Sequence, residues 1–336
     1  MKLKYFKKII VFVCINFISA SYFAQALEEQ GHNNNFWNET KNLRKAKDFD
    51  KIINILHTKL EIDTIKAWHY YQLACYYSLT KDTALAFEYI KKSIDMHIQP
   101  EDFLSDFDFE NLHDTKEWEK IKDTLITIHL ARYPNIKNKN LSVKLWLMGI
   151  EDQKPRLYGY KIFPDEPQKT KKLRDKEFYE QYINNTKFVK NLVDTNYWAI
   201  FSDVGERSGL YTMLIVQHSE DINLFKKSLA LLEQHLEDNE ITSYMYALML
   251  DRYLVKQNQK QIYGSQLLQK TILWKQFPLV FYPIEDEKNV NSRIEKMGLG
   301  TIEKLAEKHG IKYEYNPIYE NMPFKKALKM KLHRKF

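Results

Sequence analysis

Apolar residues recur along most of the chain at spacings of three and four, the pattern of a helix with one buried face. One such stripe runs through residues 48–60 and a longer one through residues 221–238. Residues 261–284 differ, because β-branched and aromatic side chains dominate there, and they predict a small β-hairpin or three short strands. The pattern therefore predicts a mainly α protein, in which a short helical solenoid precedes an α+β domain with a small β-hairpin.

A polar segment predicts the boundary between two domains. Residues 133–140 are polar and contain Pro134, and such segments commonly connect folded units. We therefore expect a first domain over residues 36–132 and a second over residues 141–313.

The second half of the chain shows further helical stripes and breaks. A helix over residues 141–156 is expected to break at Pro155, because proline removes a helical hydrogen bond. The Pro- and Lys-rich residues 157–175 predict a loop. Further helices are expected at 176–193, 207–217, 221–238, 241–256, 287–297 and 301–309.

Large and small side chains are distributed over a helical pair at residues 67–100 in a way that lets the two helices cross closely. The large residues are Tyr70, Leu73 and Tyr77, and the small ones are Ala74, Ala86 and Ser93. This spacing resembles the tetratricopeptide repeat, a helix–turn–helix unit of about 34 residues. Residues 36–66 resemble the same unit more weakly. The resemblance implies a repeat domain that binds a protein or peptide partner.

Composition supports the helical prediction and removes several function classes. Glycine and proline each occur only 9 times in 336 residues, and helix interiors exclude both. The sequence contains no GxGxxG or GxxxxGK[ST] phosphate loop and no HExxH, GxSxG or CxxC motif. The sequence therefore predicts no metal site, leaves any cofactor unknown, and leaves open whether the protein is an enzyme.

The first 26 residues have the layout of a secretory signal peptide. Four lysines precede an apolar run over residues 9–20, and Ala24-Gln25-Ala26 supplies a cleavage signal. The run is shorter than the about 20 residues that span a bilayer. We expect an exported protein, periplasmic or secreted, with no transmembrane span in the mature chain; an uncleaved anchor is the alternative.

The positive net charge of the chain comes from the basic residues at its two ends. Removal of residues 1–26 lowers the formal net charge from +7 to +3, and residues 324–336 carry six further basic residues and no acid. The remainder is slightly acidic, so we expect no nucleic-acid partner. Residues 324–336 are expected to be a basic, solvated C-terminal tail, with contact to an acidic partner or membrane surface as the alternative.

Five patches of residues 141–312 resemble an uncharacterised bacterial family, a domain of unknown function. They are Asp152-Gln153 with Arg156, LIVQHSED at 214–221, LDRYLV at 250–255, QIYGSQ at 261–266, and YPIEDEKNVNSRIEKMGL at 282–299. The patches occur in the order that the family shows. The resemblance implies no established substrate or cofactor.

These patches concentrate titratable and amide side chains at the ends of expected elements, where sites usually form. The candidate catalytic residues are His218, Asp251 and Arg252. The candidate ligand-binding residues are Gln217, Tyr263, Gln266, Asp286 and Arg293.

Each candidate also has a structural interpretation. His218 could cap a helix end instead of acting as a general base or metal ligand. Asp251 and Arg252 could belong to ion pairs that link helices, and Asp286 could be the N-cap of a helix. If these residues serve a site, we expect them to converge on one cleft.

Three functions remain open at this stage. The sequence favours a protein-interaction module built on the repeats. The alternative is a hydrolase-like or ligand-binding domain that uses the His, Asp and Arg cluster of residues 141–313. A purely structural envelope component is the third.

The signal-peptide layout predicts a mature chain that begins near Gln25 or Leu27. N-terminal sequencing of the protein recovered from the envelope or medium of its host measures this start. Intact Met1 in a membrane pellet would contradict the prediction.

Overall fold

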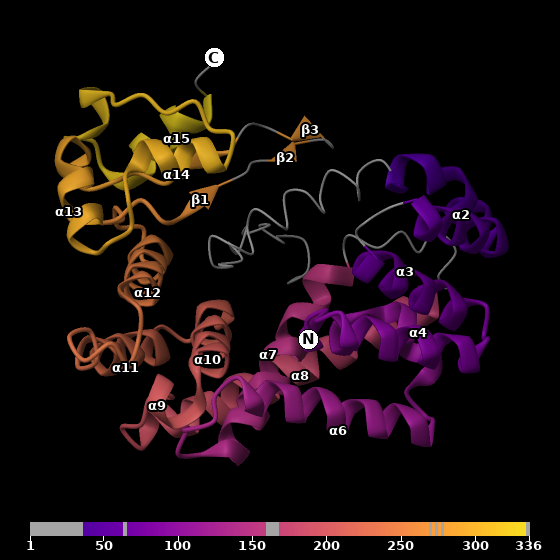
Figure 1. Cartoon of the computed structure of the whole chain (residues 1–336). Coiled ribbons are helices and arrows are strands. Elements are labelled where there is room, and N and C mark those ends of the chain that lie inside the picture. Colours follow the sequence, from indigo (N-terminus) through magenta and orange to yellow (C-terminus); the bar gives the residue numbers. More distant parts are fainter. Residues whose placement is uncertain are drawn as a thin grey trace. The chain divides into compact units, whose positions relative to one another are not determined.

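The computed structural model describes residues 36–62, 66–158, 168–268, 271–272, 275–276 and 279–333; the expected signal peptide lies outside them. These residues fall into two compact units, residues 36–185 and 186–333. The protein is mainly helical, as predicted, and the short strands among the described residues all belong to the second unit (Figure 1). Within the described ranges, no helix combines the length and the apolar character that crossing a membrane requires.

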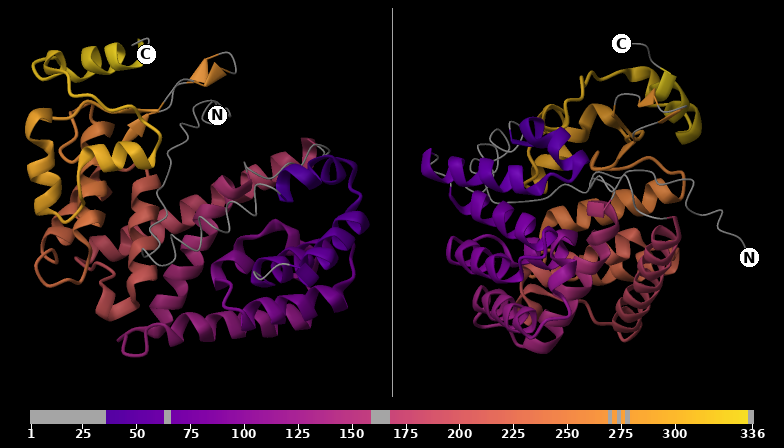
Figure 2. Two further views of the ribbon diagram at one scale, coloured as in Figure 1. Left: turned by 45° about the horizontal axis from the view of Figure 1, so that its top comes forward. Right: turned by 90° about the vertical axis from the view of Figure 1, so that its right-hand side faces the viewer.

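Helices α2 (Phe49–Ile62), α3 (Lys66–Leu79) and α4 (Thr83–Asp95) pack on one another in the first unit (Figure 2). Between α3 and α4 the chain reverses at Lys81, whose φ is +64°, and the Asp82 carboxylate accepts a hydrogen bond from Leu85 N at 3.1 Å. Ala74, Ala86 and Ser93 are completely buried. The small side chains therefore lie in the packed interior, as their spacing predicts.

The next elements are α5 (Pro100–Ser105), the 3₁₀ helix η2 (Phe107–Leu112) and α6 (Lys116–Ala131). Asp106 caps η2 by accepting from Asp108 N at 2.8 Å, and Thr115 caps α6 by accepting from Trp118 N at 3.2 Å. Trp118 and Ile121 are buried on α6, as a packing face requires.

The first unit continues past the expected boundary at residues 133–140. Helix α7 (Lys139–Tyr158) packs on α5 and α6. Its Trp146 is completely buried, donates from Nε1 to Glu101 Oε1 at 2.8 Å, and stacks on the ring of His129 with centroids 4.3 Å apart. The compact unit ends instead within α8 (Gln168–Asp194).

Two further expectations for this region are wrong. Pro155 does not end α7, which continues to Tyr158, although an interior proline removes a helical hydrogen bond and crowds the preceding turn. Residues 168–175, expected in a loop, form the start of α8. Residues 159–167 of that loop lie outside the described residues.

Four helices open the second unit after α8. They are α9 (Phe201–Val204), α10 (Glu206–His218), α11 (Ile222–Glu233) and α12 (Ser243–Lys256). Asp221 and Thr242 cap α11 and α12 through hydrogen bonds from Leu224 N and Met245 N. The last three helices pack on one another. Helix α11 ends five residues before the predicted residue 238.

The predicted β-hairpin is present. Strand β1 (Leu267–Leu268) pairs antiparallel with β4 (Val280–Phe281), and β2 (Thr271–Ile272) pairs antiparallel with β3 (Lys275–Gln276). The 3₁₀ helix η3 (Glu287–Asn289), α13 (Val290–Lys296) and α14 (Ile302–Lys308) follow. Gly298 and Gly310 adopt positive φ after α13 and α14, the conformation in which glycine commonly ends a helix.

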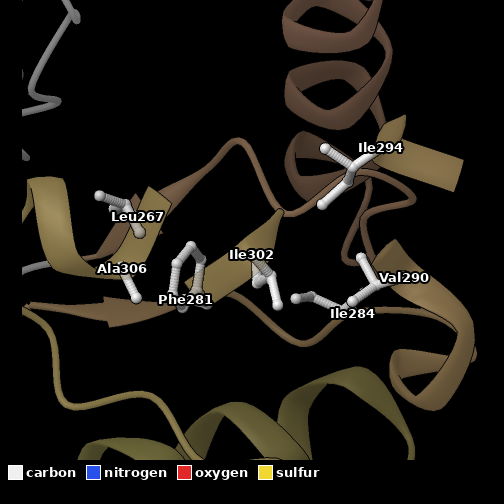
Figure 3. Packing of buried hydrophobic residues seen from close by; sticks show 7 residues of the cluster. All are labelled: Leu267, Phe281, Ile284, Val290, Ile294, Ile302 and Ala306. Atoms are coloured by element: carbon white, nitrogen blue, oxygen red, sulfur yellow. The ribbon is translucent and has the colours of Figure 1, made fainter. Parts of the chain in front are cut away.

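One apolar cluster holds the hairpin against these helices. Figure 3 shows its members converging from β1, β4 and both helices. They are Leu267, Phe281, Ile284, Val290, Ile294, Ile302 and Ala306. The Ile302 side chain would lie 2.5 Å from a Cβ added at Gly264, whose φ is +74°, so a larger residue there would disturb this core.

The basic C-terminal segment is a packed helix where a solvated tail was expected. After the 3₁₀ helix η4 (Pro317–Tyr319), residues Phe324–His333 form α15. Phe324 and Ala327 are buried, and Phe324 stacks on Tyr282 with an interplanar angle of 9°. The burial of two apolar residues in register explains why the segment is ordered despite its charge.

The contact between α7 and α5–α6 predicts that residues 36–132 depend on α7. Trp146→Ala should lower the free energy of unfolding by about 3–5 kcal/mol, because it empties a filled site and removes a donor to Glu101. Denaturant titration of the full chain measures the change. Lys139→Ala, at an exposed position of the same helix, should stay within about 0.5 kcal/mol; equal stability of the two variants would show that α7 is dispensable.

Candidate functional site

The Asp251 carboxylate is completely buried at the centre of a polar network in the second unit. Oδ1 accepts from Ile262 N at 2.7 Å, and Oδ2 accepts from Ser265 N at 2.9 Å and from Ser265 Oγ at 2.8 Å. Tyr263 N donates to both oxygens, at 3.0 and 3.2 Å. The side chain thereby fixes the loop that connects α12 to β1.

The donors offset part of the cost of burying the charge. Burial raises the pKa of the Asp251 carboxyl, and the hydrogen bonds from Ser265, Tyr263 and Ile262 act in the opposite direction. A carboxylate that accepts several amide hydrogen bonds is stabilised in its charged form. Asp251 therefore has the environment of a loop-anchoring acid.

Arg252 and Gln266, two more of the predicted site residues, are direct neighbours. Arg252 donates from Nη1 to Gln266 Oε1 at 3.2 Å, and both side chains are buried. The main chain of Gln266 is held by the completely buried Gln261, which donates to Gln266 O at 3.1 Å and accepts from Gln266 N at 2.8 Å. Gln261 also donates to Tyr282 O at 2.9 Å, so the network joins both sides of the hairpin.

Arg293 closes the same loop from α13. Its Nε donates to Ile262 O at 3.1 Å, and Nη2 donates to the carbonyls of Glu285 and Asp286. The exposed Asp286 side chain receives Arg293 Nη1 at 3.1 Å. Asp286 precedes η3 with a φ of +43° but caps no amide there; the expected N-cap role is therefore wrong, because Arg293 and Asn289 bind its carboxylate.

Gln217 and His218 lie at the C-terminal end of α10, the place predicted for them. Gln217 is buried and His218, the last residue of the helix, is half-buried. Ser219 follows, accepts from Asp221 N at 3.0 Å, and so leads into the cap of α11. Asp221 also pairs with Lys190 Nζ at 2.5 Å, and this ion pair lowers the pKa of its carboxyl.

The predicted residues thus fall into two groups. The structure joins Asp251, Tyr263, Gln266, Arg252, Arg293 and Asp286 through the loop at residues 261–266. Two shallow, open cavities lie in the described part of the chain, and none of the eight candidates lines either one. The catalytic and ligand-binding roles therefore stay predictions, while the contacts themselves are those of a structural network.

The first unit contains a cluster of two half-exposed tyrosines around the buried Tyr89, which the sequence did not single out as a site. Tyr70 and Tyr77 on α3 are half-exposed, and the ring of Tyr89 on α4 stacks on Tyr77 at 5.5 Å and lies 5.9 Å from Tyr70. His57 Nε2 is 2.9 Å from the Tyr77 hydroxyl, and Lys92 Nζ lies 4.6 Å from the centre of the Tyr89 ring. We call these five residues the tyrosine face.

The spacing of Tyr70 and Tyr77, seven residues apart on one helix, was the signal for the tyrosine face. The predicted packing of both tyrosines between helices is confirmed by their ring contacts with Tyr89 on α4, while Leu73 and Ala74 lie completely buried beside them. Burial, and next the neighbouring Tyr89, raise the pKa of the Tyr77 hydroxyl, so it stays protonated at neutral pH. The face thus offers aromatic rings with hydroxyl donors.

The carboxylates of Asp106 and Asp108 lie near the Cys75 thiol, in an arrangement that could hold a metal ion. Asp106 already accepts from Asp108 N and from the Tyr71 hydroxyl, the latter at 2.8 Å. Asp106 is therefore committed to the cap of η2, and the Cys75 thiol is buried.

Comparison with known proteins covers part of the second unit and the end of the first. Residues 177–313 match a family of unknown function (DUF6624). This finding supports the predicted resemblance of the C-terminal half, although the DUF6624 match begins after the Asp152-Gln153 patch. No curated protein and no solved structure matches the chain.

The polar network predicts large and unequal effects of two aspartate substitutions. Asp251→Ala should lower the free energy of unfolding by about 3–5 kcal/mol, because it leaves four partly buried donors without their acceptor. Asp286→Ala removes an exposed carboxylate and should cost no more than about 1 kcal/mol. Denaturant midpoints of the full-length variants measure both.

Denaturant midpoints also distinguish a structural from a functional role for Arg252 and His218. We expect Arg252→Ala to be costly and His218→Ala to stay within about 1 kcal/mol, because site residues are seldom optimised for packing. A stable Asp251→Ala chain would refute the structural assignment of the network.

Proposed function

We propose that the protein is an exported protein-interaction module in which residues 36–132, built of tetratricopeptide-like repeats, bind a protein or peptide partner. The observation that carries the proposal is the tyrosine face on α2, α3 and α4. The DUF6624 match adds no activity to it, because that family has no known function.

The tyrosine face has the chemistry of a recognition surface. Tyrosine combines a large apolar ring with a hydroxyl, and it is enriched at the energetic centre of protein interfaces. The rings are held in place by stacking and by the hydrogen bond between His57 and Tyr77. Since they are already ordered, a partner would lose little additional side-chain entropy on binding.

The charges around the tyrosine rings favour a partner segment without net charge. Lys92 lies over Tyr89 and is paired with Glu88 at 2.6 Å. A paired lysine offers no strong attraction to an acidic partner. The proposed partner therefore contributes apolar or aromatic side chains and backbone carbonyls that can accept from tyrosine hydroxyls.

The alternative of a hydrolase-like or ligand-binding second domain receives less support. Asp251, Arg252 and Gln266 are buried and use their polar atoms on one another and on the loop at residues 262–265. A catalytic acid or base must reach a substrate. The observed contacts favour a scaffold over a reactive group.

The proposal predicts that Tyr70→Ala with Tyr77→Ala abolishes capture of the partner from the exported fraction of the host. Loss of two interface tyrosines should weaken binding by at least about 2 kcal/mol. A photo-crosslinking amino acid at position 70 should in turn attach to that partner. Quantitative pull-down and mass spectrometry measure both effects.

The matched control is Tyr179, a tyrosine of the same unit on α8 that is 55% exposed. Tyr179→Ala should keep full capture, and a crosslinker at position 179 should not attach to the partner. Equal capture by the Tyr70, Tyr77 double variant and by Tyr179→Ala would contradict the proposed surface.

A further inference from the structure

Helix α15 occupies the second unit in the manner of a bound ligand. Phe324, Ala327, Leu328 and Lys331 face inward or are partly covered, and their spacing of i, i+3, i+4 and i+7 is the anchor pattern of a helix in a groove. The opposite face carries the exposed Lys325, Lys326 and Lys329. α15 is therefore a basic amphipathic helix with one bound face.

The surface that receives α15 combines aromatic rings with one buried acid. Tyr282 stacks on Phe324, and the Tyr319 ring lies 5.1 Å from Lys331 Nζ. Glu287 is 3% exposed, and both of its oxygens lie 3.2 Å from Lys331 Nζ. A cavity of about 50 Å³, lined in part by Glu287, Tyr313 and Lys331, adjoins this pair.

The buried pair gives this surface charge selectivity. Leaving a buried carboxylate without a paired cation costs free energy. Lys331 supplies that cation from a distance of 44 residues along the chain. An occupant of the surface must therefore bring a lysine or arginine seven residues after its aromatic anchor.

The attachment of α15 is small enough to be reversible. A helix of ten residues is marginal by itself in water, and among its described residues only Phe324 and Ala327 are buried apolar anchors. The preceding segment contributes one buried ring, Tyr319, and Glu320, which accepts from Lys288 N at 3.2 Å and from the Tyr315 hydroxyl at 2.8 Å. The DUF6624 match ends at residue 313, before the helix begins.

We propose that the surface formed by Tyr282, Glu287 and Tyr319 is a binding groove for a basic amphipathic helix of a partner protein, and that α15 is its intramolecular occupant. The partner helix carries an aromatic residue, a small residue three positions later and a lysine or arginine seven positions later. It competes with α15, which unfolds when it leaves. This groove is independent of the tyrosine face and of the function proposed for it.

The test uses the full chain and a fluorescent peptide of residues 320–336 as the probe. Ala327→Glu places a charge in a filled site and should release α15 without removing it. The peptide should bind this variant and show no binding to the unaltered chain at the same concentration, because the tethered helix acts at millimolar effective concentration. Fluorescence anisotropy measures binding, and circular dichroism verifies that the variant remains folded.

Charge exchange tests the pairing itself. A Lys331→Glu peptide should bind the Ala327→Glu chain roughly 100-fold more weakly and should recover on a chain that also carries Glu287→Lys. A Lys329→Glu peptide of identical composition, altered on the exposed face, should bind within about threefold of the original. Equal loss for both peptides, or no rescue, would overturn the proposed groove.

Hydrogen exchange on the unaltered chain provides a second measurement. If α15 is a detachable occupant, its amides should exchange by local opening while those of α12 stay protected. Exchange of α15 only together with α12, or global unfolding of the Ala327→Glu chain, would show that α15 is a permanent part of the core and would overturn the proposal.

Discussion

A fully buried carboxylate is tolerated only when donors surround it, and Asp251 imposes this constraint on the second unit. Three main-chain amides and the Ser265 hydroxyl satisfy it, which forces the loop after α12 into one conformation. The hairpin begins at the end of that loop, and the apolar cluster around Ile284 and Ile302 forms only if the hairpin is correctly placed. The position of one charge therefore determines how helices and strands meet.

The local features of the fold could be predicted from the sequence, because neighbouring residues encode them. The apolar stripe of α11 and the positive φ of Gly298 and Gly310 depend on residues within one or two helical turns. The small residues Ala74, Ala86 and Ser93 likewise marked where helices cross. Such features require no knowledge of what lies far away in the chain.

The features that were missed depend on distant partners. The donors to Asp251 are mostly main-chain amides. Every residue type except proline supplies such an amide, so the pattern of side chains in the sequence could not predict these contacts. The order of α15 depends on Tyr282 and Glu287, and the continuation of the first unit into α7 depends on Glu101. From charge and polarity alone, residues 324–336 were expected to be a solvated tail and residues 133–140 a linker between domains.

The candidate residues of the two units differ in their accessibility, and this difference bears on function. In the second unit Asp251, Arg252 and Gln266 are buried, and their polar atoms form hydrogen bonds within the fold. In the first unit Leu73 and Ala74 of α3 are completely buried, and the rings of Tyr70 and Tyr77 remain half-exposed. A buried side chain whose polar atoms are already hydrogen-bonded within the fold cannot readily bind a ligand. An ordered and accessible tyrosine can use both its ring face and its hydroxyl for binding. Recognition is therefore better supported by the tyrosines than by the charged residues that the motifs emphasised.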